Sequence, residues 1–123
     1  MQEITKAQEE VLQALWEINQ GAVSDVLDAM EEPKPAYNTV ATVIKVLEGK
    51  GYVKHVKYGK THVFSPSVSK NEYAQTKLKE TFRELFNGSP QQLFSSFFKT
   101  EDISLRELDE LKQLIESKIE KSK

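Results

Sequence analysis

The chain has 123 residues, no cysteine, 38% hydrophobic and 29% charged residues, and a formal net charge of −2. These values are typical of a globular protein with one modest core, and the absence of cysteine excludes disulfides and thiolate metal sites. No apolar run approaches the roughly 18 residues that a membrane-spanning helix needs. The first ten residues lack the basic and apolar parts of a signal peptide. We therefore expect a cytoplasmic protein.

The helices of the first half begin at recognisable caps. A capping box at Thr5–Gln8, in which side chains satisfy free backbone donors, predicts a first helix over 6–18. Val23 is then expected to pair as a very short strand. Ser24 is expected to cap a second helix over about 24–31.

A third helix and a hairpin follow. The spacing of Val40, Val43, Ile44 and Leu47 predicts a helix over 37–49 with these side chains inward. The period then changes to two, which predicts strands over 52–57 and 61–65 around a turn. Three helices followed by a hairpin form a winged helix-turn-helix, whose third helix lies in the major groove of DNA. We assign residues 1–68 to a winged-helix DNA-binding domain.

Charge along the chain agrees with this assignment. Residues 1–34 carry 2 Lys/Arg against 8 Asp/Glu (net −6), residues 35–66 carry 5 Lys against one Glu (net +4), and residues 67–123 carry 10 of each (net 0). A local basic segment fits a surface that contacts phosphates, because DNA affinity depends on the local field and on counterion release. The alternative is an ordinary solvated surface.

The candidate DNA-contacting residues fall in two groups. On the third helix, one face opposite the inward positions carries residues that can bond adenine, meet a thymine methyl, or reach guanine or phosphate: Asn38, Thr39, Ala41, Thr42 and Lys45. Tyr37, at the start of this helix, fits a phosphate contact or a cap on the core. At the tip of the hairpin, the expected phosphate contacts are Lys57, Tyr58, Lys60 and Thr61.

The second half predicts three more helices, over about 70–87, 90–98 and 105–120, which are preceded by Ser–Glu or Ser–Gln capping spacings. Their apolar residues exceed what three short helices can hide: Phe82, Phe86, Phe94, Phe97, Phe98, Leu108, Leu111 and Ile115. We therefore expect residues 69–123 to form a dimerisation region covered by a second copy. The alternative is that these helices fold back on the winged helix as one monomeric core.

Other functions find little support. His55 and His62 lie in neighbouring strands, but without a nearby carboxylate or thiol they make a poor metal site. The chain has no Gly-rich phosphate loop and no HExxH motif, so we expect neither an enzyme nor a cofactor. The remaining alternative to a DNA-binding protein is a winged helix used only for protein contacts, which the basic excess over residues 35–66 argues against.

Segments spread over nearly the whole chain match, in order, one family of regulators. They are Ile4–Gln8, Val11–Trp16, Val23–Val26, Tyr37–Thr42, Leu47–Val53, Phe64–Ser69, Leu85–Ser89, Glu101–Ser104 and Glu107–Leu108. On these segments the chain resembles the BlaI/MecI/CopY repressors, dimeric winged-helix regulators of β-lactamase and related antibiotic-resistance genes. The resemblance implies a homodimeric repressor that binds an inverted-repeat operator.

The resemblance also implies how repression is relieved. β-Lactam-responsive members are inactivated by proteolysis, commonly at an Asn–Phe bond, with a membrane-bound sensor protease as partner; the matching bond here is Ser96–Phe97. The family usually has Arg where this chain has Val46, which removes a cationic contact. The C-terminal cysteine cluster of copper-responsive members is missing, so metal sensing by that route is not expected.

Overall fold

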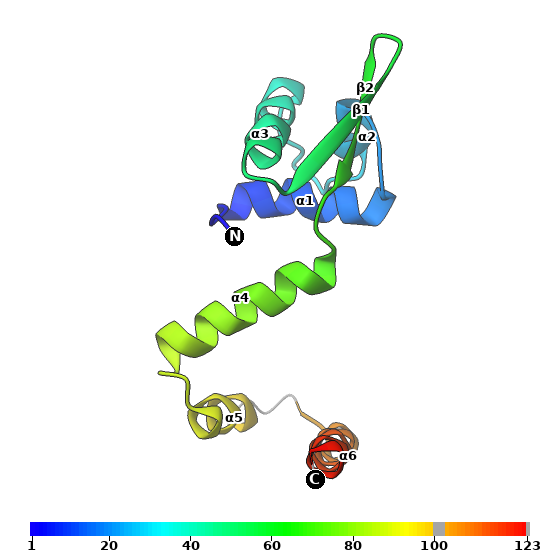
Figure 1. Ribbon diagram of the computed structural model, residues 1–123. Helices are drawn as coiled ribbons and strands as arrows, with labels where there is room; N and C mark the ends of the chain where they lie inside the picture. The colour runs from blue at the N-terminus through cyan, green and yellow to red at the C-terminus, as the bar shows by residue number, and fades with distance from the viewer. Residues whose placement is uncertain (100–102, 123) are drawn as a thin grey trace. The chain divides into compact units, whose positions relative to one another are not determined.

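A computed structural model describes residues 1–99 and 103–122. The chain forms two compact units, residues 1–78 and 79–123 (Figure 1). The first unit contains α1 (Lys6–Ile18), α2 (Val23–Asp28), α3 (Tyr37–Gly49), β1 (Val53–Tyr58), β2 (Thr61–Pro66) and the beginning of α4 (Lys70–Leu85). Three helices and a two-stranded hairpin in this order confirm the predicted winged helix-turn-helix and the mostly helical fold class.

The start of α2 differs from the prediction. The cap is Ala22, and the Asp25 carboxylate accepts its backbone N–H at 2.9 Å, so the prediction of Ser24 as the cap was wrong. Gly21, and not Val23, makes the short β-bridge, which pairs with Phe64. The tight space around Gly21 favours glycine, because an added Cβ would lie 2.8 Å from the Cβ of Asp25.

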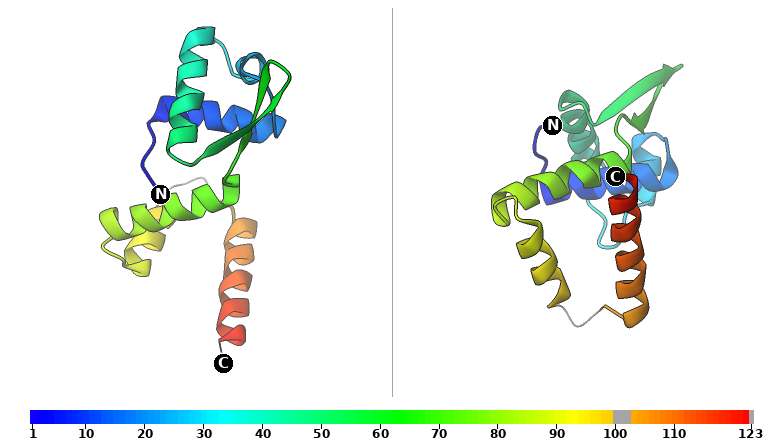
Figure 2. Two further views of the ribbon diagram at one scale, coloured as in Figure 1. Left: turned by 45° about the horizontal axis from the view of Figure 1, so that its top comes forward. Right: turned by 60° about the horizontal axis from the view of Figure 1, so that its bottom comes forward.

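The hairpin is closed by a two-residue loop. Tyr58 pairs with Thr61, which leaves Gly59 and Lys60 between the strands. Gly59 has a φ of 62°, a conformation that glycine adopts without steric cost and that tight hairpin loops require. The tip of the hairpin extends beyond the three helices, as Figure 1 and the right-hand view of Figure 2 show.

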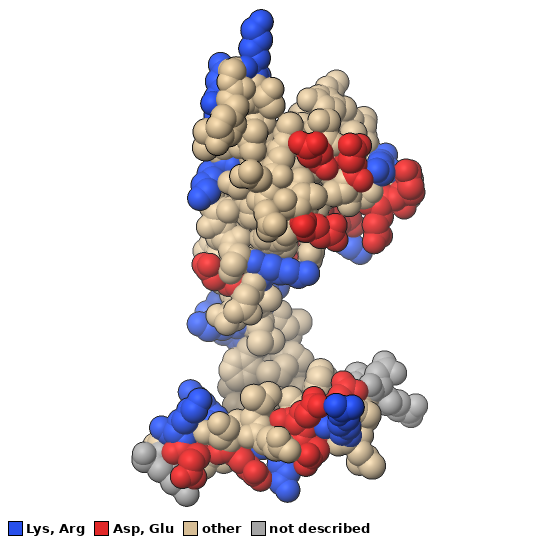
Figure 3. Space-filling model, turned by 90° about the vertical axis from the view of Figure 1, so that its right-hand side faces the viewer, with Lys and Arg blue, Asp and Glu red and all other residues tan. Residues whose placement is uncertain are grey.

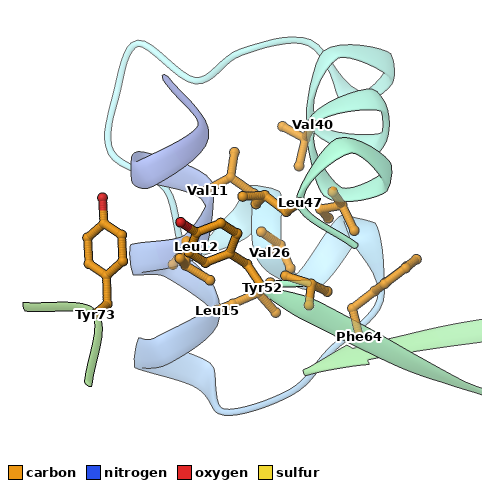
Figure 4. Close-up of a cluster of buried hydrophobic side chains, with 12 residues drawn as sticks. Val11, Leu12, Leu15, Val26, Val40, Leu47, Tyr52, Phe64 and Tyr73 are labelled. Carbon is orange, nitrogen blue, oxygen red and sulfur yellow. The ribbon is translucent and has the colours of Figure 1, made fainter. Parts of the chain in front are cut away.

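The core of the first unit lies between α1, α2, α3 and the hairpin (Figure 4). Its members have exposed fractions of 9% or less: Val11, Leu12, Ala14, Leu15, Val26, Val40, Ile44, Leu47, Tyr52, Val53, Phe64 and Tyr73. Val43, which was expected inside, is only half-buried against this cluster. Tyr73 lies beyond the predicted domain boundary at 68/69 and still packs in this core, so the compact unit extends into α4.

The second unit contains the end of α4, α5 (Pro90–Phe98) and α6 (Leu105–Lys121). After α4, Asn87 and Gly88 both have positive φ, and the Gly88 backbone N–H donates to the Phe82 carbonyl at 2.9 Å, which ends the helix. Ser89 caps α5 by accepting the backbone N–H of Gln92 at 3.2 Å, and Ser104 forms a capping box at the start of α6. Among the described residues, no helix is long and apolar enough to cross a membrane.

Candidate nucleic-acid interface

Helix α3 separates a buried face from a polar one. Val40, Ile44 and Leu47 are fully buried. The predicted contact residues lie on the other side: Asn38, Thr39, Thr42 and Lys45 are exposed and Ala41 is half-buried. A helix turns 100° per residue, so burial of the apolar positions at steps of three and four places these side chains together on the outer face. The structure therefore brings the predicted α3 residues to one surface.

Two details refine this surface. The Thr42 hydroxyl donates to the backbone carbonyl of Asn38 at 2.9 Å, so toward DNA it can act only as an acceptor or through its methyl group. Val46 is 36% exposed and lies one turn after Thr42 on the same face. The sequence identifies Val46 only as a departure from the family pattern, but its i+4 spacing from Thr42 places it on the same outer face as the predicted contact residues.

The hairpin exposes all four of the predicted contact residues, with Tyr58 at 65%. The pairing register puts Lys57 on the sheet face that it shares with His62, whereas Tyr58 and Thr61 share the opposite face. Lys60 lies in the two-residue loop at the tip. The hairpin thus presents its side chains in three directions, and the structure does not join them into one patch.

The lysines of this region differ in their partners. Lys50 donates to the backbone carbonyl of Glu3 at 2.8 Å and to Oε1 of Gln8 at 3.2 Å, so it ties α3 to the N-terminal segment. Among the described residues, the side chains of the other four lysines between positions 35 and 66 have no hydrogen-bond or ion-pair partner: Lys45, Lys54, Lys57 and Lys60. Four of the five basic residues between 35 and 66 therefore keep their charge available to solvent or to a ligand.

Figure 3 shows how charge is separated on the first unit. Lys and Arg (blue) gather at the top of the view around the hairpin tip, and Asp and Glu (red) gather lower, on the right of the same unit. On this face of the first unit, most acidic side chains thus lie apart from the basic side chains near the hairpin tip, although both belong to one compact body. This separation explains how a chain of net charge −2 can present a positive surface.

A contact between α3 and the hairpin involves His55, which also stacks on His62 within the hairpin. Nδ1 of His55 lies 2.5 Å from Oε2 of Glu48, and the rings of His55 and His62 stack with centroids 4.7 Å apart. The sequence analysis placed no carboxylate near these imidazoles. That was wrong, because Glu48, in the last turn of α3, reaches His55 in the hairpin. Among the described residues, no group of three or more His, Cys, Asp or Glu side chains could hold a metal ion.

The predicted dimerisation residues are only partly covered within one chain. Phe94, Phe97, Phe98 and Ile115 are 38–48% exposed, while Phe82, Phe86, Leu108 and Leu111 are half-buried. Phe98, Leu108, Leu111 and Ile115 line one groove, edged by Lys112 and Glu116. Ser96 and Phe97, the predicted cleavage bond, lie within helix α5.

Comparison with known proteins now adds a family to this geometry. Residues 4–117 match the model of the penicillinase repressor family. The chain belongs to this family. It is 24% identical to the penicillinase repressor of Bacillus licheniformis (93% of this chain, 90% of the relative) and 23% identical to the methicillin resistance regulatory protein MecI of Staphylococcus aureus (94% and 95%). The resemblance that the sequence motifs indicated is thereby confirmed.

Membership settles the class of function. The family consists of transcriptional repressors and not of enzymes, so this chain is a winged-helix DNA-binding repressor. Among solved structures, MarR from E. coli matches with a TM-score of 0.47 and 14% identity, covering 93% of this chain and 76% of MarR.

Proposed function

We propose that this repressor acts in the cytoplasm as a homodimer on an inverted-repeat operator, with α3 of each subunit in the major groove. The observation that carries the proposal is the single outer face of α3, which holds Asn38, Thr39, Thr42 and Lys45 above a fully buried apolar face. Asn bonds both edges of adenine and Thr meets thymine methyls, so this face suits base contacts. Ala41 and Tyr37 border the same surface.

The hairpin supplies the phosphate contacts in this proposal. The side chains of Lys57 and Lys60 are exposed and have no partner among the described residues, and Tyr58 and Thr61 offer hydroxyl groups on the other face of the hairpin from Lys57. Contacts to phosphate position a protein on DNA without reading its sequence. We therefore assign readout to α3 and positioning to the hairpin.

A second copy would cover the apolar surface of the second unit. Three phenylalanines of α5 are each at least 38% exposed, and the groove that Leu111 and Ile115 line is open. Burial of such side chains in a symmetric interface removes apolar area from water, which favours association. This proposal also explains why an inverted repeat would be the preferred operator, since a two-fold dimer presents two α3 helices symmetrically.

Relief of repression is proposed to occur by proteolysis at Ser96–Phe97, with a membrane-bound sensor protease as partner and β-lactam-resistance genes as targets. The named relatives support this context, because they are repressors of penicillinase and regulators of methicillin resistance. A cut within α5 would separate α6 from the rest of the chain. The dimer would then loosen, and a monomer on one half-site loses the avidity of two linked sites. Helical backbone must open locally before a protease can bind it.

One set of measurements tests the binding proposal. The full chain should shift an inverted-repeat duplex selected from a random library, and should bind a scrambled duplex of equal length more weakly. Light scattering should give a dimer for the full chain and a monomer for Leu111→Asp, whereas Leu114→Asp, at a 67% exposed position outside the groove, serves as the matched control. A monomeric full chain, or equal binding to both duplexes, would contradict the proposal. The second result would favour a protein-interaction module.

The cleavage proposal has its own test. Cells that hold the partner protease are induced with a β-lactam, and the repressor fragments are mapped by mass spectrometry. A new end at or within about two residues of Ser96–Phe97 is expected. Intact repressor in fully derepressed cells would contradict this mode of control and indicate a small-molecule or partner-binding switch.

A further inference from the structure

The first turns of α4 are bound tightly to the winged helix. Tyr73 is 9% exposed, and its ring lies 5.5 Å from that of Trp16 and 6.0 Å from that of Tyr52, measured between centroids. Trp16 comes from α1, and Tyr52 immediately precedes β1. Aromatic pairs at these distances and tilts add to the stabilisation from burial itself. The beginning of α4 is therefore part of the core of the first unit.

Polar contacts surround these rings. The Tyr73 hydroxyl donates to Oε2 of Glu9 at 2.6 Å, and Nζ of Lys77 lies 3.7 Å from the same oxygen and 3.4 Å from the Tyr73 hydroxyl. Nε1 of Trp16 donates to the backbone carbonyl of Val68 at 2.9 Å, which holds the segment that leads into α4. We call Glu9, Trp16, Tyr52, Tyr73 and Lys77 the α4 clamp.

The α4 clamp holds two points of one helix. Tyr73 and Lys77 are one turn apart on the same face, and both contact Glu9 of α1, so the clamp restrains the direction of α4 as well as its position. Apolar residues further along α4 do not share this face: Phe82 is nine residues after Tyr73, which places it about 180° around the helix. One face of the first turns of α4 is thus packed on the winged helix, and Phe82 lies on a different face of the same helix.

We propose that the α4 clamp sets the spacing of the two half-sites that the dimer reads. This inference rests on the proposed function, because spacing has meaning only for a dimer on DNA. From Tyr73 to the end of α4 at Leu85 is roughly 18 Å at 1.5 Å per residue, so a tilt of about 10° at the clamp moves that end by about 3 Å. The rise of one base pair is about 3.4 Å. A small loosening at Tyr73 therefore changes which spacing the two α3 helices fit.

In this proposal, Tyr73 and Lys77 act as positioning residues and do not contact DNA bases. Tyr73→Phe keeps the ring and removes the hydroxyl, and Lys77→Ala removes the second contact to Glu9. Lys79→Ala is the matched control, since Lys79 is an exposed lysine of the same helix that lies outside the α4 clamp. Circular dichroism establishes that each variant is folded before binding is measured.

The experiment measures the dissociation constant of the full chain for inverted repeats of the selected operator with spacings that differ by one base pair, and for a duplex with a single half-site. The unsubstituted chain should prefer one spacing by about tenfold or more, because a mismatch must be met by deforming DNA or protein. Tyr73→Phe and Lys77→Ala should reduce this preference about threefold or more, with unchanged single-half-site affinity and an unchanged dimer in light scattering. Lys79→Ala should behave as the unsubstituted chain.

Three results would overturn the inference. If the variants lose thermal stability but keep the full spacing preference, the α4 clamp only stabilises the fold. If single-half-site affinity falls by the same factor as affinity for the repeat, the clamp acts on the winged helix alone. A monomeric unsubstituted chain, or one without preference for an inverted repeat, would refute the proposed function and, with it, this role of the α4 clamp. This failure differs from the other two because the unsubstituted chain alone reveals it.

Discussion

The different partners of the lysines lead to a quantitative prediction for Lys60→Ala. Lys60 lies exposed in the hairpin loop and has no partner among the described residues, so its removal should leave the fold unchanged. If it contacts phosphate, each subunit loses one contact and the dimer loses two. The slope of log K against log salt should then become less steep by about 1.8, at about 0.9 per phosphate.

The size of this effect is measurable. Over a fourfold rise in salt, from about 50 to about 200 mM, a slope difference of about 1.8 corresponds to a roughly twelvefold smaller loss of affinity. The assay is a titration of labelled operator by fluorescence anisotropy at four or five salt concentrations. Because phosphate contacts carry no sequence information, the ratio of affinities for operator and scrambled DNA should stay constant.

Lys50→Ala is the matched control, because Lys50 lies in the same basic segment but already has partners within the protein. The Lys50 amine already bonds Glu3 and Gln8, so its removal should lower the free energy of unfolding and leave the salt slope unchanged. An unchanged slope for Lys60→Ala, or a reduced slope for Lys50→Ala, would refute the assignment of phosphate contacts from partner-free lysines. A change of base preference in Lys60→Ala would mean that the hairpin reads sequence.

Three further substitutions separate readout from stability. Thr42→Ala should relax discrimination at one operator position by about 1–3 kcal/mol, measured on single-base variants; a uniform loss over all variants would contradict a base contact. Ile44→Ala, at a fully buried position, should lower the free energy of unfolding by about 2–5 kcal/mol in urea titrations, and a loss below about 1 kcal/mol would mean that the core refills. Trp16→Phe deprives the Val68 carbonyl of its donor and should cost about 0.5–3 kcal/mol in the same assay, whereas no loss would show that water replaces the bond.

Most helix and strand positions could be read from short-range signals. The capping boxes at Thr5 and Ser104 form as predicted, and Ser89 and Pro90 begin α5. These motifs involve residues three positions apart, so local sequence contains all the atoms that make them. The two-residue loop with Gly59 is equally local. The polar face of α3 followed because helical periodicity alone separates it from the buried residues.

The start of α2 shows where local signals are insufficient. Ser24 and Asp25 are both good capping residues by type. Neither is the cap, because α2 begins after Ala22, which directly follows Gly21, and the backbone of Gly21 pairs with Phe64 in the hairpin. A partner 43 positions away along the chain cannot be found from a window of a few residues.

The sequence by itself determined the family, the order of helices and hairpin, and the polar face of α3, because each depends on periodicity, caps or ordered motifs within short segments. Only the tertiary structure decided which polar side chains form hydrogen bonds or ion pairs within the protein. It pairs Lys50 with Glu3, Glu48 with His55, and Tyr73 with Glu9, a residue 64 positions away. These pairings arise because chain folding, and not sequence distance, brings a donor within about 3 Å of an acceptor. A lysine or tyrosine has the same chemistry in either setting, and its surroundings decide whether it holds the fold or meets a ligand.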